Sequence, residues 1–293
     1  MNFDNPDNRS NKKSFRYEKL SKASLIVSIV LSMILISTIV FRERGLQKTD
    51  DLRKLYYKDI DVTELSKKSE APIVGPHKIQ KSFEELLKIN PETVGWIKAG
   101  KLADEPVVYR DNEHYLNYDF YGNRNSIGTV FIDVENSDWE HSKYIILYGH
   151  YLENGGKFGS LKKYKNLKDL KDNLTFEWNT IYTDEPEEYV VFSVFESSML
   201  KSEKDYFYLR RFEELKTGES ETEKLIEELK KRSIFNIPVE VTPNDKIMCL
   251  VTCSYEKKDG RLLIFGRKVR PDEAVDSIKD KISEKQTGFT NDK

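Results

Sequence analysis

A succession of short β-type segments constrains the fold of this chain more than any other feature. Downstream of Asn90-Pro91, segments rich in Val, Ile, Tyr and Phe alternate with turn residues, which is the pattern of strands in an all-β protein. We predict strands at residues 94–97, 106–109, 128–133, 144–148, 174–182, 188–195, 239–241, 246–253 and 262–269. Eight or so short strands of this kind indicate a mainly β fold, either a barrel or a sandwich.

Helical segments flank and interrupt this series. Apolar residues at helical spacing predict helices within residues 47–68 and around 83–87, and a short helix is expected within 157–172. A longer helix is expected at 220–233, where Ser220 and Glu223 fit a capping box.

The most apolar stretch lies near the N-terminus. Residues 23–41 contain nineteen residues without a charge or a proline, which as a helix would measure about 28 Å. A cleaved signal peptide is the competing interpretation, but no small-x-small cleavage site follows the stretch. We therefore predict an uncleaved transmembrane anchor with a short cytoplasmic N-terminus and a long extracellular domain. Ser24, Ser28 and Ser32 repeat every four residues, a pattern that favours self-association of membrane helices only weakly, and a monomer is expected.

These segments divide the chain into five predicted regions. They are a cytoplasmic tail at 1–22, the transmembrane anchor at 23–41, a helical stalk or linker at 42–80, a catalytic domain at 81–275 and a polar C-terminal tail at 276–293.

Charge and cysteine content exclude two broad classes of function. Lys and Arg total 48 against 50 Asp and Glu, so the chain has no general basic field for binding nucleic acid. Only two cysteines occur, which excludes a disulfide-stapled scaffold. Cys249 and Cys253 lie in one predicted strand, where their Cα atoms would be about 13 Å apart, too far for a disulfide.

Cys253 is a candidate nucleophile because it ends a buried strand and faces a polar turn. His150 ends another predicted strand, and an imidazole is the usual proton partner of a reactive thiol. Arg261 starts the strand after the turn, so a hairpin would return it beside the thiol, although a surface arginine fits the local sequence equally well. Cys249 lies among apolar neighbours and is expected to be a buried structural thiol. A zinc site formed by Cys249, Cys253 and His150 is disfavoured because no fourth ligand appears at a suitable spacing.

Several motifs resemble those of one family in the same order. They are Asn90-Pro91-Glu92-Thr93-Val94-Gly95-Trp96-Ile97, Pro106-Val107-Val108, Asp111-Asn112, Tyr115-Leu116, Asp119-Phe120-Tyr121-Gly122, Gly128-Thr129-Val130-Phe131, Tyr148-Gly149-His150, Gly156-Lys157-Phe158-Gly159-Ser160-Leu161, Leu250-Val251-Thr252-Cys253 and Gly260-Arg261-Leu262. Together, behind an N-terminal anchor, these motifs resemble the class B sortases, cysteine transpeptidases of Gram-positive bacteria. The resemblance covers roughly residues 83–269.

The resemblance implies a closed eight-stranded barrel with N-terminal helices and a helix inserted between the sixth and seventh strands. It also implies that Cys253 attacks the carbonyl after the threonine of a C-terminal sorting signal, forming a thioacyl-enzyme. His150 would exchange protons with the departing and incoming amines, and Arg261 would bind the signal and the oxyanion. The product would be joined to an amino group of the peptidoglycan cross-bridge, or of a pilin lysine. The corresponding location is the cell membrane, with the catalytic domain outside.

The resemblance further implies a signal similar to Asn-Pro-x-Thr followed by Asn, Gly or Ser. The implied substrate-binding residues are Asn112, Leu116, Tyr148, Tyr182, Val251 and Thr252. Val251 stands where the family usually has a serine, which removes a hydroxyl beside the nucleophile. No metal and no organic cofactor is expected. The alternatives are a non-catalytic anchored scaffold that shares the barrel, and a cysteine peptidase that hydrolyses its substrate.

Overall fold

The protein is described here from a computed structural model of the 293-residue chain. The structure describes residues 6–58, 73–74, 77–153, 155–182, 185–210, 218–254 and 258–285. The chain forms two compact units, Met1–Lys48 and Thr49–Lys293.

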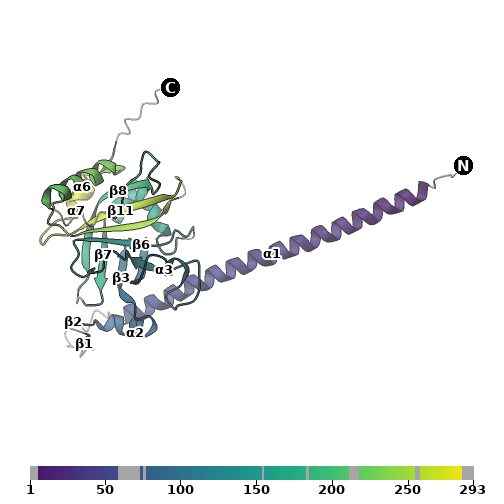
Figure 1. Cartoon of the computed structure of the whole chain (residues 1–293), viewed down its shortest axis with the longest axis horizontal. Coiled ribbons are helices and arrows are strands. Elements are labelled where there is room, and N and C mark those ends of the chain that lie inside the picture. The colour runs from purple at the N-terminus through teal and green to yellow at the C-terminus, as the bar shows by residue number, and fades with distance from the viewer. Residues whose placement is uncertain are drawn as a thin grey trace, which may run out of the picture. The chain divides into compact units, whose positions relative to one another are not determined.

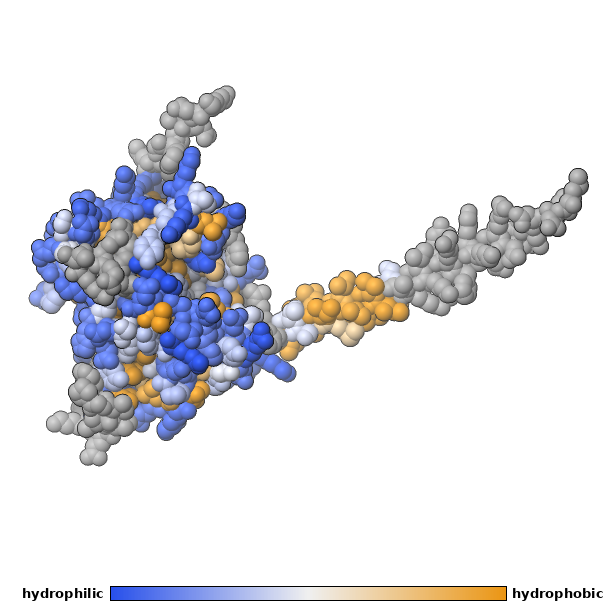
Figure 2. All heavy atoms as spheres, viewed as in Figure 1, coloured by the Kyte–Doolittle hydropathy of each residue, from blue (hydrophilic) through white to orange (hydrophobic). Residues whose placement is uncertain are grey.

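The first unit consists of the larger part of helix α1, which runs over Pro6–Lys58. The apolar side chains between Leu25 and Val40 are exposed along the helix and form the continuous orange stretch of α1 in Figure 2. Among the residues the structure describes, no helix is both long enough and apolar enough to cross a membrane. The structure therefore does not support the transmembrane helix predicted at 23–41, whose end residues have side chains outside the described set.

The second unit is built on a closed barrel of eight strands, in the order β10-β11-β8-β7-β3-β4-β5-β6. Figure 1 labels five of them, β3, β6, β7, β8 and β11. Most neighbours are antiparallel, and β4 with β5 and β6 with β10 form the two parallel pairs. The barrel strands are β3 (Thr93–Ala99), β4 (Ala103–Val108), β5 (Val130–Ile132), β6 (Tyr144–Tyr148), β7 (Thr175–Thr180), β8 (Glu187–Ser198), β10 (Ile247–Ser254) and β11 (Gly260–Lys268). The prediction of an eight-stranded barrel is confirmed.

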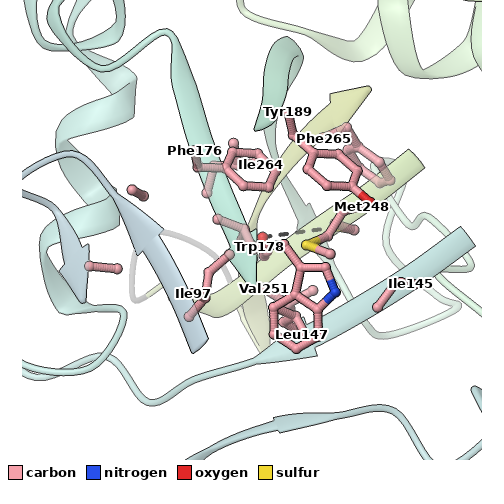
Figure 3. Packing of buried hydrophobic residues seen from close by; sticks show 14 of the residues in the cluster. Ile97, Ile145, Leu147, Phe176, Trp178, Tyr189, Met248, Val251, Ile264 and Phe265 are labelled. Carbon is pink, nitrogen blue, oxygen red and sulfur yellow. Dashed lines mark hydrogen bonds between the residues drawn. The ribbon is translucent and has the colours of Figure 1, made fainter. Parts of the chain in front are cut away.

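Large apolar side chains from these strands fill the core. Figure 3 shows Trp178 and Phe176 of β7 beside Phe265 of β11 and Met248 of β10, and all four are essentially inaccessible to solvent. Gly95 makes room for the Trp178 ring, because a Cβ at this position would lie 2.5 Å from it. A core packed from side chains of several strands holds the strand ends in fixed relative positions.

The remaining elements surround the barrel. They are the β1–β2 pair (Ile73–Val74 and His77–Lys78), α2 (Lys81–Ile89), α3 (His114–Asn117), the 3₁₀ helix η1 (Gly159–Lys165), α4 (Leu167–Asp172), α6 (Glu219–Arg232), α7 (Asp276–Lys279), and the β9–β12 pair (Phe235–Asn236 and Ser283–Glu284). Helix α6 lies between the sixth and seventh barrel strands, as predicted, and packs on β8, where the Ser193 hydroxyl donates to the Leu229 carbonyl at 2.6 Å.

Two local predictions in this region are wrong. Residues 239–241 form no strand, and β9 occurs a few residues earlier. Helix α6 begins after Gly218 without a side-chain cap, so the capping box at Ser220 is absent. Gly218, the residue before the helix, has φ 146°, a backbone conformation that residues with a side chain rarely adopt.

Residues near both ends of the second unit are buried against the rest of it. Within the predicted stalk, Leu52 and Tyr56 of α1 are buried, and the Tyr56 ring stacks on Trp96 of β3 with centroids 4.2 Å apart. Within the predicted polar tail, Ile278 and Ile282 are buried. The packed unit therefore includes the last turns of α1 and the chain as far as β12.

Candidate active site

The ends of two neighbouring parallel strands carry the candidate acid-base and nucleophilic residues. Tyr148 of β6 lies opposite Val251 of β10, and the Gly149 N–H donates to the Val251 carbonyl at 3.0 Å. His150 and Cys253 each follow two residues later along their chains, so they emerge at the same end of the barrel.

The hairpin between β10 and β11 brings Arg261 beside Cys253. Cys253 and Arg261 are directly opposite in the antiparallel ladder, as predicted from their spacing. Opposite residues in such a ladder project from the same face with Cβ atoms about 5 Å apart. Both cysteines are free, and Cys253 is half-buried. Cys249 is fully buried, and burial raises the pKa of its thiol well above the ordinary value.

A pocket of about 380 Å³ opens between these residues. Its lining includes the three candidate catalytic residues, His150, Cys253 and Arg261. It also includes Asn112, Leu116, Phe131, Tyr148, Gly149, Met199, Tyr206, Phe207, Tyr208, Leu209, Arg210 and Val251. The apolar wall with a few polar groups is typical of a site that binds an extended peptide or another organic ligand.

The protonation of His150 follows from its hydrogen bond. Its Nε2 lies 2.7 Å from the Leu116 carbonyl oxygen, which can only accept, so Nε2 carries a proton and donates it. The same edge of the ring packs on Gly128, where a Cβ would lie 2.7 Å from the His150 Cδ2. Gly128 also has φ 63°, so both the lack of space and the backbone conformation disfavour a larger residue here. The other ring nitrogen, Nδ1, is the one left for proton exchange with a reacting group.

Arg261 is held by its own turn. Its Nη1 donates to the Gly260 carbonyl at 2.9 Å and pairs with the Asp259 carboxylate at the same distance. A guanidinium carries five N–H donors, so Nε and Nη2 are the ones that remain for a ligand in the pocket. The side chain is 29% exposed, which leaves it accessible from the pocket.

Four of the six predicted substrate-binding residues line this pocket: Asn112, Leu116, Tyr148 and Val251. Thr252 and Tyr182 do not. Thr252 is 2% exposed. Successive strand residues face opposite sides, so its side chain points away from the side that Val251 and Cys253 share. Tyr182 instead stacks on Trp139, with ring centroids 6.0 Å apart.

The segment from Tyr206 to Arg210, between β8 and α6, contributes a wall of the pocket that the sequence analysis did not assign. The segment matches no recognised motif, and its sequence signal is limited to four aromatic or charged residues, Tyr206, Phe207, Tyr208 and Arg210, shortly before a predicted helix. An ion pair attaches the segment to the barrel, since Arg210 Nε lies 2.9 Å from the Asp133 carboxylate.

Asp133 is completely buried and joins both sides of the pocket. The same carboxylate oxygen accepts from Arg210 and from the Tyr148 hydroxyl at 2.8 Å. Burial, followed by the nearby carboxylate, raises the pKa of Tyr148 far above its usual value, so the phenol stays protonated and donates. Asp133 therefore fixes the position of two pocket residues at once.

No group of three or more His, Cys, Asp or Glu side chains within the described part of the chain is arranged to hold a metal ion. Cys249 lies in the core while Cys253 lines the pocket, so the two thiols do not share a site with His150.

Known proteins resemble this chain in sequence and in fold. Sortase B of Listeria monocytogenes is 27% identical over 225 residues, which are 75% of this chain and 83% of the relative. Sortase B of Staphylococcus aureus is 29% identical over 196 residues, which are 66% of this chain and 76% of the relative. The structure of a Staphylococcus aureus sortase B–substrate complex matches with a TM-score of 0.63 and 23% identity, covering 78% of this chain and 98% of that one. No protein-family model matches the chain.

The closed barrel has the fold of the solved sortase B, and the similarity to the two curated relatives supports a cysteine transpeptidase of the sortase type. Both curated relatives are sortase B, and this similarity supports a class B sortase.

Proposed function

We propose that this sortase cleaves a C-terminal sorting signal of the form Asn-Pro-x-Thr followed by Asn, Gly or Ser, after the threonine. The acyl group is then joined to an amino group of the peptidoglycan cross-bridge. The observation that carries the proposal is that Cys253, His150 and Arg261 line one pocket at the same end of the barrel. The solved Staphylococcus aureus relative is a substrate complex, which supports a peptide ligand for this pocket.

The reaction exchanges one amide bond for another. The Cys253 sulfur bonds to the threonine carbonyl carbon, the C–N bond breaks, and the leaving nitrogen takes a proton from His150. In the second half an amine attacks the thioester carbon, gives its proton to His150, and the C–S bond breaks to restore the thiolate. Both steps are acyl transfers that change no oxidation state, so the reaction needs no oxidant and no cofactor.

His150 is suited to this shuttle because its Nε2–H is engaged by the Leu116 carbonyl. Nδ1 then carries the exchanged proton, and the ring keeps one orientation through both halves of the reaction. Arg261 lies across the ladder from Cys253, where its remaining N–H donors would stabilise negative charge that develops on the attacked carbonyl oxygen.

The enzyme is to be tested as the full chain in detergent, with fluorescent peptides ending in Asn-Pro-x-Thr-Asn, -Gly or -Ser. Cys253→Ala is expected to lower turnover by a factor on the order of 10³ or more, because the covalent intermediate cannot form. Cys249→Ala is the matched control, since this thiol is buried in the core, and it should retain turnover. Unchanged turnover in Cys253→Ala would remove the nucleophile assignment.

The acceptor distinguishes transfer from hydrolysis. With triglycine present, mass spectrometry should find the peptide acyl group joined to the glycine amine. A product that is always the free acid, at every triglycine concentration, would favour the hydrolytic cysteine peptidase instead.

We also propose that residues 23–41 hold the enzyme at the cell surface by insertion into the membrane. Support comes from the nineteen uncharged residues of this stretch and from the exposure of its described apolar side chains on α1. In cell fractionation the full chain should stay with the membrane after a high-salt or carbonate wash. A variant with Leu31→Lys and Ile34→Lys should be released by that wash, and retention of this variant would contradict the proposal.

A further inference from the structure

The loop after His150 folds back on the histidine itself. Tyr151 forms an isolated β-bridge with Lys157, and the Phe158 N–H donates to the His150 carbonyl at 3.1 Å. Phe158 also packs on the preceding backbone, because a Cβ on Gly149 would lie 2.6 Å from its ring. The backbone of His150 is therefore tied to the place where Lys157 and Phe158 are held.

Lys157 is held by a buried ion pair. Its side chain is 5% exposed, and its Nζ lies 2.9 Å from the carboxylate of Glu105 in β4, which is 2% exposed. Nζ also donates to the Thr49 hydroxyl at 3.4 Å. The other Glu105 oxygen accepts from Arg53 at 3.3 Å. We call these four residues the Lys157 cluster.

The cluster joins three separate parts of the catalytic unit. Thr49 and Arg53 belong to the last turns of α1, Glu105 belongs to the barrel, and Lys157 belongs to the histidine loop. A lysine side chain that reaches a carboxylate in the barrel fixes the depth at which the loop sits, because both atoms lose their partners if the loop moves outward.

A role in stability alone would not favour these residues. Burying two charges costs nearly as much as their attraction returns, and apolar side chains of similar size usually serve a core as well. Lys157 also has φ 53°, a left-handed conformation in which a glycine would be less strained. What a buried, hydrogen-bonded ion pair does provide is a single defined geometry.

We propose that Lys157 is a positioning residue for His150. Its ion pair with Glu105 sets the loop so that the His150 ring meets the Leu116 carbonyl with one edge and presents Nδ1 to the pocket. Arg53 and Thr49 complete this support, which makes the last turns of α1 part of the active-site framework. The inference rests on the proposed role of His150 as the proton carrier.

The test compares Lys157→Met and Glu105→Gln in the full chain, with Lys163→Met as the control. Lys163 is an exposed lysine of η1, only a few residues away. The two cluster variants should lower kcat at least tenfold with KM changed less than twofold, and should shift the pH profile of kcat/KM. The control should match the wild-type enzyme in all three.

The double variant Lys157→Met/Glu105→Met removes both buried charges and decides the outcome if a single variant does not fold. A folded double variant with wild-type kcat and pH profile overturns the proposal. So does a loss of kcat that disappears when the variants are assayed far below their unfolding temperatures, since the cluster would then serve stability only.

A separate readout distinguishes this inference from the proposed function. Titration of the His150 ring by NMR needs no substrate, and Lys157→Met should change its ring shifts and midpoint while Lys163→Met leaves them unchanged. If wild-type enzyme and peptide give no product, the proposed function fails, and the NMR titration still decides the positioning role. Identical His150 spectra in the two variants overturn it.

Discussion

Replacing Asp133 by asparagine should loosen one wall of the pocket without changing its shape. The carboxylate is fully buried and accepts three hydrogen bonds, from Tyr148 at 2.8 Å, from Arg210 at 2.9 Å and from the Glu135 N–H at 2.9 Å. The amide has only one oxygen. The substitution therefore loses either the two hydrogen bonds from Tyr148 and Arg210, which share one carboxylate oxygen, or the single hydrogen bond from the Glu135 N–H to the other oxygen. Hydrogen bonds to a charged group contribute about 1.5–3 kcal/mol each.

The expected cost of Asp133→Asn is about 2–3 kcal/mol in the free energy of unfolding. The value lies below the full sum because the Arg210 side chain is 38% exposed and water screens its ion pair. The Arg210 segment should also become less ordered, so KM for the sorting peptide should rise about tenfold, equivalent to about 1.4 kcal/mol.

Urea unfolding followed by tryptophan fluorescence gives the free energy of unfolding, and peptide kinetics give KM. Glu135→Gln is the control, because it removes only a 3.5 Å pair to the same arginine with a carboxylate that is 44% exposed. This control should cost less than about 0.5 kcal/mol. An Asp133→Asn enzyme with the unfolding free energy and KM of the wild type would refute the reasoning.

Two further predictions concern the barrel outside the pocket. The fully buried Arg267 donates two hydrogen bonds to Glu273, which lowers the pKa of that carboxyl. This contribution is present above the ordinary glutamate pKa and is lost as pH falls through the lower folded value, so Glu273→Gln should destabilise by about 1–2 kcal/mol at pH 7 and by progressively less in acid. Asp272→Asn is the exposed control, and a penalty for Glu273→Gln that stays constant down to pH 3 in urea melts would contradict this account. Secondly, iodoacetamide should label native enzyme at a single cysteine and reach Cys249 only after unfolding, because burial keeps its thiol protonated. Modification of Cys249 in the native enzyme, detected by peptide mass spectrometry, would show that the core opens.

The barrel could be predicted from the sequence because its strands have a recognisable local sequence pattern. Residues 144–148 and 246–253 combine β-branched and apolar residues with flanking turns, and they match β6 and β10 almost to the residue. The pairing of Phe235–Asn236 with Ser283–Glu284 could not be predicted, since two-residue strands have no periodicity and their partners are far apart in the chain.

The candidate site was predictable where it depends on strand ends and hairpin register. The placement of Arg261 opposite Cys253 follows from the turn length alone. Thr252 was included among the pocket residues because alternation along the strand was not applied to it, and it does not line the pocket. The Tyr206–Arg210 wall was missed because its position depends on Asp133, a contact between segments about eighty residues apart that no local pattern encodes.

The parallel pairing of β6 with β10 has a consequence for the order of folding. Some hundred residues separate these strands, and the loop between them must close before His150 and Cys253 can meet. Until β6 and β10 pair, the Cys253 thiol has no imidazole beside it. The proposed thiol–imidazole pair can therefore form only when β6 and β10 close the barrel.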